Sequence, residues 1–373
     1  MIGRRSFLRA SLGRIAAGAW VADGAAAALA APDPPRSRAY VDGLASLDIE
    51  YSKSLFGEMA DGGVRVCVAS LGTPRLASEA AFGRAVKDVG AFAQFAGRWG
   101  DRLTVVKGAS DLERAQQAGK LALVYAFENA GVLGDEIERL DVLFKTGVRV
   151  LQLTYNVRND VGDGYLEPTN GGLSRFGLDV IGRMNELGML VDVSHCADAT
   201  SDGAILFSSA PCAITHAGCR AVFEHPRNKP DETLKNLARK GGVVGIYQTL
   251  PFLGPPSTAT APGAGLELYL SHVDHAIDVA GIDHVGVASD RDYRRASTSE
   301  ARRRQAEDLA RDEAVEIVGA TNAVYVEELA SAKRMDVLAD ALQKRGRSAA
   351  DVDKILGGNF RRLLQETLKR NGE

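Results

Sequence analysis

MLVDVSH, residues 189–195, runs from apolar residues straight into a histidine. Near-continuous apolar runs of this length are typical of strands buried on both faces, as in a parallel sheet. Seven further runs of this kind recur along the chain: YVDGLAS (40–46), VRVCVAS (64–70), LALVYAF (121–127), VRVLQLT (148–154), PCAIT (211–215), GGVVGIYQ (241–248) and HVGVAS (284–289). Eight such strands predict an α/β fold, a single-domain (β/α)8 TIM-like barrel.

The segments between these runs have the apolar spacing of helices. Helices are predicted at 78–98, 134–146, 174–187, 266–281 and 324–345, and the run rich in Arg, Asp and Glu at 291–313 predicts a solvent-exposed helix. The Pro- and Gly-rich stretch 249–265 predicts a loop over the barrel mouth. A doubly wound nucleotide-binding fold is the alternative architecture, but no GxGxxG motif opens a helix after the first strand.

The first thirty residues have the composition of an export signal. Arg4-Arg5-Ser6-Phe7-Leu8 is a twin-arginine pattern, and Ala28-Leu29-Ala30 matches the small-x-small cleavage rule. We therefore expect residues 1–30 to direct twin-arginine export to the periplasm, and residues 31–373 to form the barrel domain. The alternative is a basic tail without a signal function. No other run reaches the roughly 18 apolar residues of a spanning helix, so we expect no stable membrane insertion.

Charge and cysteine content describe an ordinary globular enzyme. The 45 basic and 48 acidic residues give a net charge of −3, and without residues 1–30, which carry four Arg and one Asp, it becomes −6. That balance argues against nucleic acid as a partner. The four cysteines lack the close paired spacing of a zinc knuckle or redox motif. Cys67 and Cys212 lie in apolar runs, so we expect at least these two to be buried free thiols.

Polar residues directly follow five of the apolar runs: Glu128, Tyr155, His195, His216 and Asp290. The C-terminal strand ends of a β/α barrel meet at one active site. Two imidazoles and a carboxylate, from His195, His216 and Glu128, are the ligand set of a catalytic zinc site, where the metal lowers the pKa of its water to about 7. Asp290 is placed to hydrogen-bond that water and move its proton. A lone His after a strand is more often a packing residue, but three such groups on equivalent strand ends favour a metal site.

Short motifs occur in a fixed order through the chain: GLSxFG (172–177), MNxLGMLVDVSH (184–195), AP (210–211), TH (215–216), RNxPD (227–231), SD (289–290) and ILGGNFxR (355–362). In this order they resemble the membrane (renal) dipeptidase family of metallopeptidases. The resemblance implies a barrel with a two-metal site that hydrolyses dipeptides, often with a D-residue at the C-terminal position. A small peptide is then the expected partner, and the resemblance also implies a homodimer as one option.

The resemblance also implies roles for individual residues. It makes Glu128 the bridging metal ligand, and His195 and His216 the ligands of one metal ion. It places Asp290 at the catalytic acidic position and Arg227 at the residue that holds the substrate carboxylate.

The chain departs from the family pattern on the first strand. Where the family has Asp-Gly-His-x-Asp, this chain has Asp-Gly-Leu-Ala-Ser at 42–46. Leu44 cannot coordinate a metal, Ser46 is a weak neutral donor, and Asp48 lies about 6–7 Å further along the strand direction. We therefore expect one zinc ion per chain rather than two. Tyr155 replaces a substrate-binding His, and its phenol can still donate a hydrogen bond to a developing oxyanion.

Three functions follow from these observations. The first is an exported metal-dependent dipeptidase-like hydrolase that cleaves a dipeptide or small modified peptide. The alternatives are a repurposed periplasmic peptide-tailoring enzyme and a catalytically inactive peptide-binding homologue. The presence of Glu128, His195, His216 and Asp290 together favours an enzyme.

Overall fold

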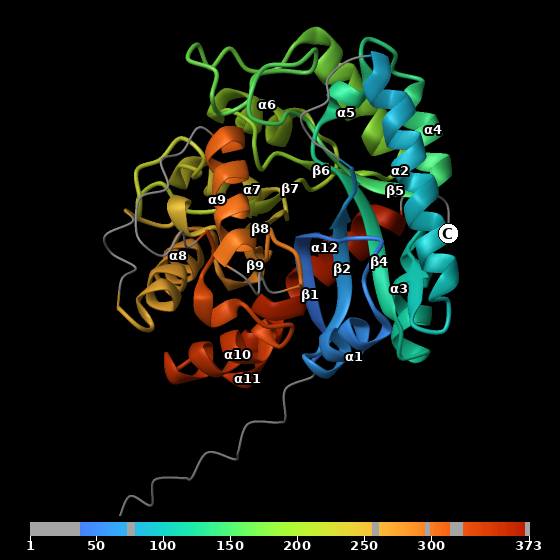
Figure 1. Cartoon of the computed structure of the whole chain (residues 1–373). Coiled ribbons are helices and arrows are strands. Elements are labelled where there is room, and N and C mark those ends of the chain that lie inside the picture. Colours follow the sequence, from blue (N-terminus) through green and yellow to red (C-terminus); the bar gives the residue numbers. More distant parts are fainter. Residues whose placement is uncertain (1–37, 73–78, 256–260, 295–298, 314–323, 370–373) are drawn as a thin grey trace, which may run out of the picture. The chain divides into compact units, whose positions relative to one another are not determined.

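The computed structural model describes residues 38–72, 79–255, 261–294, 299–313 and 324–369. The expected signal peptide, residues 1–30, lies outside the described residues. Nine parallel strands form one sheet in this part of the chain (Figure 1). Eight of them follow one another in the order β1 (Tyr40–Ser46), β2 (Val64–Ser70), β4 (Leu121–Phe127), β5 (Val148–Gln152), β6 (Leu190–Asp192), β7 (Ala213–Ala217), β8 (Val243–Ile246) and β9 (Val285–Val287).

The ends of this sheet meet, so it forms a barrel. Asp290, just after β9, donates its backbone N–H to the carbonyl of Leu44 in β1 at 2.9 Å. The backbone N–H of Ser289 donates to the Asp42 carboxylate at 2.7 Å. The predicted eight-stranded parallel barrel is therefore confirmed. The ninth strand, β3 (Leu103–Val105), pairs with the start of β4 and was not predicted, because its three residues form too short an apolar run.

Helices separate the strands, as the parallel pairing requires. They are α1 (Lys53–Asp61), α2 (Glu79–Arg98), α3 (Ala109–Gln117), α4 (Arg139–Thr146), α5 (Arg175–Leu187), α6 (Asp198–Phe207), α7 (Asp231–Arg239), α8 (Ala264–Ala280), α9 (Ser299–Glu313), α10 (Arg334–Lys344), α11 (Ala349–Asp353) and α12 (Asn359–Leu368). Short 3-10 turns span Ala130–Leu133, Leu250–Phe252, Ile282–His284 and Glu327–Leu329, and a π-helical turn spans Lys354–Gly358.

Most of the helix predictions are confirmed, with two corrections. Helices α2, α5 and α8 lie where the sequence predicts them, and α4 and α9 are shorter than the predicted segments, since residues 291–294 are not helical and 295–298 lie outside the described part. The predicted helix at 324–345 is wrong in its first ten residues, because 324–326 are extended and hydrogen-bond to the segment after β8. The stretch 249–265 contains a short 3-10 turn and the start of α8, while residues 256–260 lie outside the described part.

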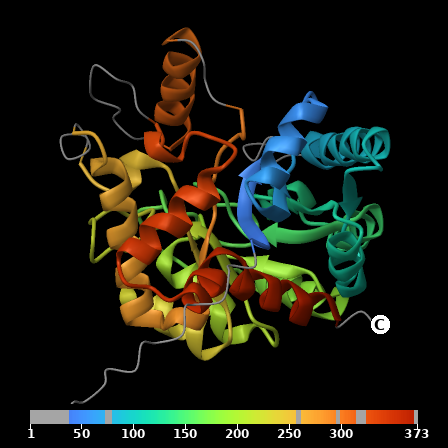
Figure 2. The same ribbon diagram turned by 90° about the horizontal axis from the view of Figure 1, so that it is seen from below.

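The N-terminal end of the barrel is filled by α12. The Phe360 ring lies so close to β1, β8 and β9 that a Cβ on Gly43, Gly245 or Gly286 would overlap or crowd it. Figure 2 shows the C-terminal helices, in red, crossing the barrel at this end. Asn359 donates from Nδ2 to the carbonyls of Ile282 and Val285, which holds α12 to the approach to β9. The ILGGNFxR motif therefore serves the fold and leaves the opposite end for the site.

The cysteines are all buried and free, so the expectation for Cys67 and Cys212 is confirmed. In the described parts of the chain we find no helix with the length and apolar character needed to cross a membrane.

Candidate metal centre and active site

Three polar side chains from distant parts of the sequence converge at the C-terminal end of the barrel. Glu128 directly follows β4, His195 follows β6, and His216 lies in β7. Glu128 Oε2 is 3.7 Å from His195 Nε2 and 3.6 Å from His216 Nε2. The two Nε2 atoms are 2.8 Å apart. All three side chains are buried, and they form the single cluster of three or more metal-ligating groups in the described residues.

The protonation of His195 follows from its neighbour Asn156. His195 Nδ1 lies 2.6 Å from Asn156 Oδ1. An amide oxygen only accepts hydrogen bonds, so Nδ1 carries the proton and Nε2 carries a lone pair. Burial, with Arg227 as the next cause, holds the pKa of His195 well below its usual value. The ring is therefore the neutral form that binds metals.

His216 is held in the same tautomer by a relay of side chains. Its Nδ1 is 2.8 Å from Thr215 Oγ1, which donates its own proton to Asp192 Oδ2 at 2.6 Å. Thr215 must therefore accept from His216 Nδ1, which leaves a lone pair on Nε2. Burial, helped by Arg227 and Lys229, holds the pKa of His216 well below its usual value.

The donor set fits a metal ion. Two lone pairs that face each other at 2.8 Å repel, and a cation between them and the Glu128 carboxylate removes that repulsion. Two imidazole nitrogens and one carboxylate oxygen are a recognised catalytic zinc ligand set. The hydrogen bonds that the two Nδ1–H groups donate to Asn156 and Thr215 fix the ring orientations in the way that outer partners of metal ligands do.

Glu128 is oriented by hydrogen bonds to its side-chain carboxylate and to its backbone carbonyl. Ser70 Oγ donates to Glu128 Oε1, so this oxygen faces away from the histidines. Gln152 Nε2 donates to the Glu128 backbone carbonyl at 2.5 Å. The remaining oxygen, Oε2, is therefore the one presented to His195 and His216.

Asp290 lies beside the cluster in a strained backbone conformation. Its φ is +51°, in the left-handed region that a non-glycine residue rarely adopts. This conformation places Oδ1 4.0 Å from His216 Nε2, while Oδ2 accepts a hydrogen bond from Thr249 Oγ1 at 3.0 Å. Strain of this kind is concentrated at functional sites.

Tyr155 and Arg227 also lie against the cluster. The Tyr155 ring stacks on His195, with centroids 4.3 Å apart and planes 23° from parallel. Arg227 is buried, and its Nη1 donates to the Ser194 carbonyl at 2.7 Å. Its guanidinium also lies 5.2 Å from the centre of the Tyr247 ring.

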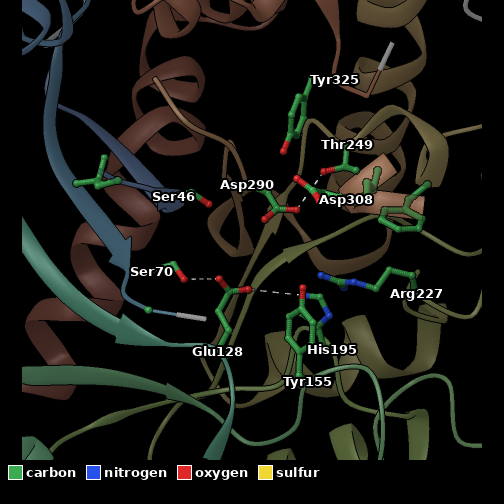
Figure 3. A pocket seen from close by; sticks show the side chains of 14 residues that line it. Ser46, Ser70, Glu128, Tyr155, His195, Arg227, Thr249, Asp290, Asp308 and Tyr325 are labelled. Atoms are coloured by element: carbon green, nitrogen blue, oxygen red, sulfur yellow. Dashed lines mark hydrogen bonds and ion pairs between the residues drawn. The ribbon is translucent and has the colours of Figure 1, made fainter. Parts of the chain in front are cut away.

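These residues border a cavity of about 330 Å³ (Figure 3). Its lining comprises Ser46, Leu47, Ser70, Gly72, Glu128, Tyr155, His195, Arg227, Thr249, Phe252, Asp290, Asp308, Leu309 and Tyr325. Five of the six side chains predicted from sequence line it, and the sixth, His216, contacts three of them. The structure thus brings the whole predicted set together.

The first strand contributes little to this cavity. Leu44 is buried in the barrel core, and Ser46 is the residue of β1 that reaches the cavity lining. Asp48, the acid beyond it, accepts a hydrogen bond from Arg294 Nη2 at 2.6 Å and does not line the cavity.

Several residues of the site were not found from sequence. Asp192 is an acid inside an apolar run, a signal that could have marked it, whereas Thr215, Asn156 and Ser70 carry no signal that separates them from ordinary polar residues. Their roles depend on contacts that only the fold creates.

Comparison with known proteins agrees with the fold and with the family resemblance. A model of the membrane dipeptidases, peptidase family M19, matches residues 41–300. The chain belongs to this family. Similar proteins include dipeptidase verJ of Clonostachys rogersoniana, 35% identical over 52% of this chain and 49% of the relative, and dipeptidase tcpJ of Claviceps purpurea, 28% identical over 72% and 56%. The chain thus spans about half the length of the curated relatives it matches.

Solved structures resemble the chain over most of its length. An amidohydrolase from Pseudomonas aeruginosa has a TM-score of 0.75 at 27% identity, covering 89% of this chain and 97% of that one. An M19 metallopeptidase, dipeptidase AC, has a TM-score of 0.71 at 19% identity, covering 88% and 98%. At such low identity the second likeness supports the M19 barrel fold alone.

Proposed function

We propose that this protein is a metal-dependent dipeptidase that hydrolyses the amide bond of a dipeptide or small modified peptide. The observation that carries the proposal is the pair of neutral imidazoles, His195 and His216, facing each other at 2.8 Å beside the Glu128 carboxylate in a cavity of dipeptide size. We propose zinc as the cofactor, at one ion per chain, because β1 adds no His or carboxylate ligand to the cavity. Held there, zinc would supply Lewis-acid catalysis, activating a water molecule and polarising the scissile carbonyl.

The chain's own residues divide the remaining work. Asp290, beside the cluster, would take the proton of the attacking water and return it to the leaving amine. Tyr155, stacked on His195, would donate its phenol hydrogen to the developing oxyanion. Arg227, the guanidinium found in the lining among the described residues, would bind the substrate carboxylate.

Metal analysis and peptide turnover test this proposal directly. Purified protein is expected to carry about one zinc ion per chain and to hydrolyse short dipeptides such as L-Ala-L-Ala or L-Ala-D-Ala. A chelator is expected to abolish turnover, and zinc to restore it. Two tightly held ions would contradict the one-metal site. Bound metal without turnover of any dipeptide would instead identify a peptide-binding homologue, and turnover of modified peptides alone would identify a tailoring enzyme.

The proposed enzyme acts in the periplasm after twin-arginine export. The Arg4-Arg5 pair supports this, because it is an address read by a receptor. Replacing both arginines with lysine is expected to leave the protein in the cytoplasmic fraction. Export of the double variant at the wild-type level would show that another route is used.

Arg227→Lys tests the carboxylate contact. A guanidinium holds a carboxylate by two parallel hydrogen bonds, which an ammonium cannot reproduce. The variant is expected to raise KM for a free-carboxylate dipeptide by more than about tenfold, the scale of a charge-assisted hydrogen bond. The amidated dipeptide should be a poor substrate for the wild type, and the variant should discriminate little between acid and amide. Because Arg227 also bonds the Ser194 carbonyl, bound zinc is measured alongside. Equal discrimination by both proteins would rule out the assigned contact.

A further inference from the structure

Part of the cavity lining comes from chain segments that follow β9. Asp308 and Leu309 lie on α9, and Tyr325 lies in the extended segment 324–326. Figure 3 shows Tyr325 and Asp308 on the same side of the cavity as Asp290, while Glu128 and Tyr155 lie on the other side. None of the three proposed metal ligands belongs to these segments, so the polar groups of Asp308 and Tyr325 can contact the substrate instead of the metal.

Tyr325 is held firmly in this position. Residues 324–326 pair with the segment after β8, through bonds from Leu250 N to Val324 O at 2.8 Å and from Val326 N to Gln248 O at 3.0 Å. The Tyr325 ring also lies over the Arg291 guanidinium, 4.5 Å from it. The phenol therefore points into the cavity (Figure 3).

The Tyr325 hydroxyl stays protonated in this environment. Burial, and then the nearby Asp290 carboxylate, raise the pKa of Tyr325 above its usual value. A neutral phenol offers an oxygen lone pair to an N–H donor and a hydrogen to a carboxylate. It can therefore bridge an ammonium group and an acidic side chain.

Among the described residues, three carboxylates line the cavity, and two of them lie at the proposed metal site. Glu128 faces the two histidines, and Asp290 has one oxygen 4.0 Å from His216 Nε2 and the other bonded to Thr249. The third, Asp308, lies on α9 and pairs with Arg311 of the same helix.

Asp308 is an accessible negative charge. Its side chain is 60% exposed and pairs with Arg311 one turn along α9. Exposed pairs of this kind contribute little to stability, so Asp308 can exchange Arg311 for a better partner. Both Asp308 and Arg227 line the cavity. Their opposite charges match the ammonium and the carboxylate of a zwitterionic dipeptide.

The size of the cavity agrees with this charge arrangement. Two extended residues span about 7 Å, and a volume of about 330 Å³ suits a ligand of that length. A dipeptide with its carboxylate on Arg227 and its scissile carbonyl at the cluster has its amino group on the far side of the scissile bond. Of the acidic side chains in the described lining, Asp308 is the one that neither faces the histidines nor bonds Thr249, so we assign this amino group to it.

We propose that Asp308 and Tyr325 bind the free amino group of the substrate, so that the enzyme selects unblocked dipeptides. The inference rests on the dipeptidase activity proposed above. The ammonium group donates to the Asp308 carboxylate and to the Tyr325 phenolic oxygen, replacing the Arg311 pair. Both residues are specificity determinants, and neither takes part in bond cleavage.

The test compares L-Ala-L-Ala with propionyl-L-alanine, which has a hydrogen in place of the ammonium group and adds no bulk. Wild type is expected to prefer L-Ala-L-Ala in kcat/KM by more than about tenfold, the value of one hydrogen bond to a charged group. Asp308→Asn is expected to lose about tenfold on L-Ala-L-Ala, mainly through KM, and nothing on propionyl-L-alanine. Tyr325→Phe is expected to show the same pattern with a smaller loss.

Glu307→Gln is the matched control. Glu307 is the neighbour of Asp308 on α9, is exposed, pairs with Arg303 and does not line the cavity. This variant removes the same charge from the same helix, and it is expected to behave as wild type towards both compounds. The Asp308 effect, being electrostatic and partly exposed, is also expected to shrink in 1 M salt, where charges are screened beyond about 3 Å.

The outcomes separate this inference from the proposed activity. Similar turnover of both compounds by wild type, or unchanged preference in Asp308→Asn, overturns the amino-group subsite and leaves the dipeptidase proposal standing. Equal losses of kcat/KM in Asp308→Asn and Glu307→Gln overturn the amino-group subsite as well. The loss would then come from the net charge of α9 and not from a contact between Asp308 and the substrate. Turnover of neither compound overturns the activity and the subsite together.

Discussion

His216→Ala is expected to abolish tight zinc binding and to lower kcat/KM for a dipeptide on the order of a thousandfold or more, the rate equivalent of several kcal/mol of lost metal stabilisation. His216 is fully buried, and its Nε2 lies 2.8 Å from His195 Nε2 and 3.6 Å from Glu128 Oε2. Without this nitrogen, the proposed site retains one imidazole and one carboxylate. Elemental analysis after dialysis gives the zinc content, and initial rates give kcat/KM.

Thermal unfolding separates metal loss from misfolding. A ligand that binds the folded state alone raises Tm, so added zinc is expected to stabilise the wild type and not His216→Ala. Leu44→Ile is the matched control, because it alters a buried strand residue at nearly constant volume and touches no proposed ligand. It is expected to retain the metal and most of the activity. Full zinc content in His216→Ala would show that the ion lies elsewhere.

The barrel was predictable because its strands are buried on both faces. Each of the eight apolar runs becomes a strand, since a strand inside a barrel contacts the core on one side and helices on the other. Strand β3 was not predicted because it is three residues long and pairs with the start of β4 alone. The extended conformation of residues 324–326 was not predicted because their hydrogen-bond partners, Gln248 and Leu250, are distant in sequence.

The candidate ligands were predictable for a related reason. A residue that directly follows a barrel strand faces the common mouth, so Glu128, His195 and Asp290 could be grouped without knowing any distance. Supporting residues follow no such rule. Thr215 fixes the His216 tautomer only because Asp192, on the neighbouring strand, accepts the hydrogen bond of the Thr215 hydroxyl, which leaves the Thr215 oxygen to accept from His216.

The cavity residues outside the barrel were the hardest to foresee. Asp308 lies in a helix rich in charges, where sequence pattern gives no means of telling a cavity residue from a solvated one. Tyr325 reaches the cavity through its pairing with the segment after β8. In the proposed subsite, substrate selection therefore depends on residues outside the barrel strands, whose positions are set by α9 and by the pairing of residues 324–326 with the segment after β8.

Asp290→Asn is expected to lower kcat by about 10²–10⁴-fold, the usual contribution of a general acid–base group, with bound zinc unchanged. The substitution keeps the shape of the side chain and its bond with Thr249, and Asn tolerates the left-handed φ of +51° better than most residues. The substitution removes a carboxylate that can accept and return a proton; its Oδ1 lies 4.0 Å from His216 Nε2.

A proton-transfer role predicts a specific pattern of kinetic change. The loss in Asp290→Asn should fall on kcat, with KM changed little, because the substrate carboxylate and amino group are bound elsewhere. Asp48→Asn is the matched control, since Asp48 bonds Arg294 outside the cavity lining and is expected to be dispensable for turnover. If Asp290→Asn kept more than about a tenth of wild-type kcat, or lost its zinc, Asp290 would be a support of the metal site rather than its proton carrier.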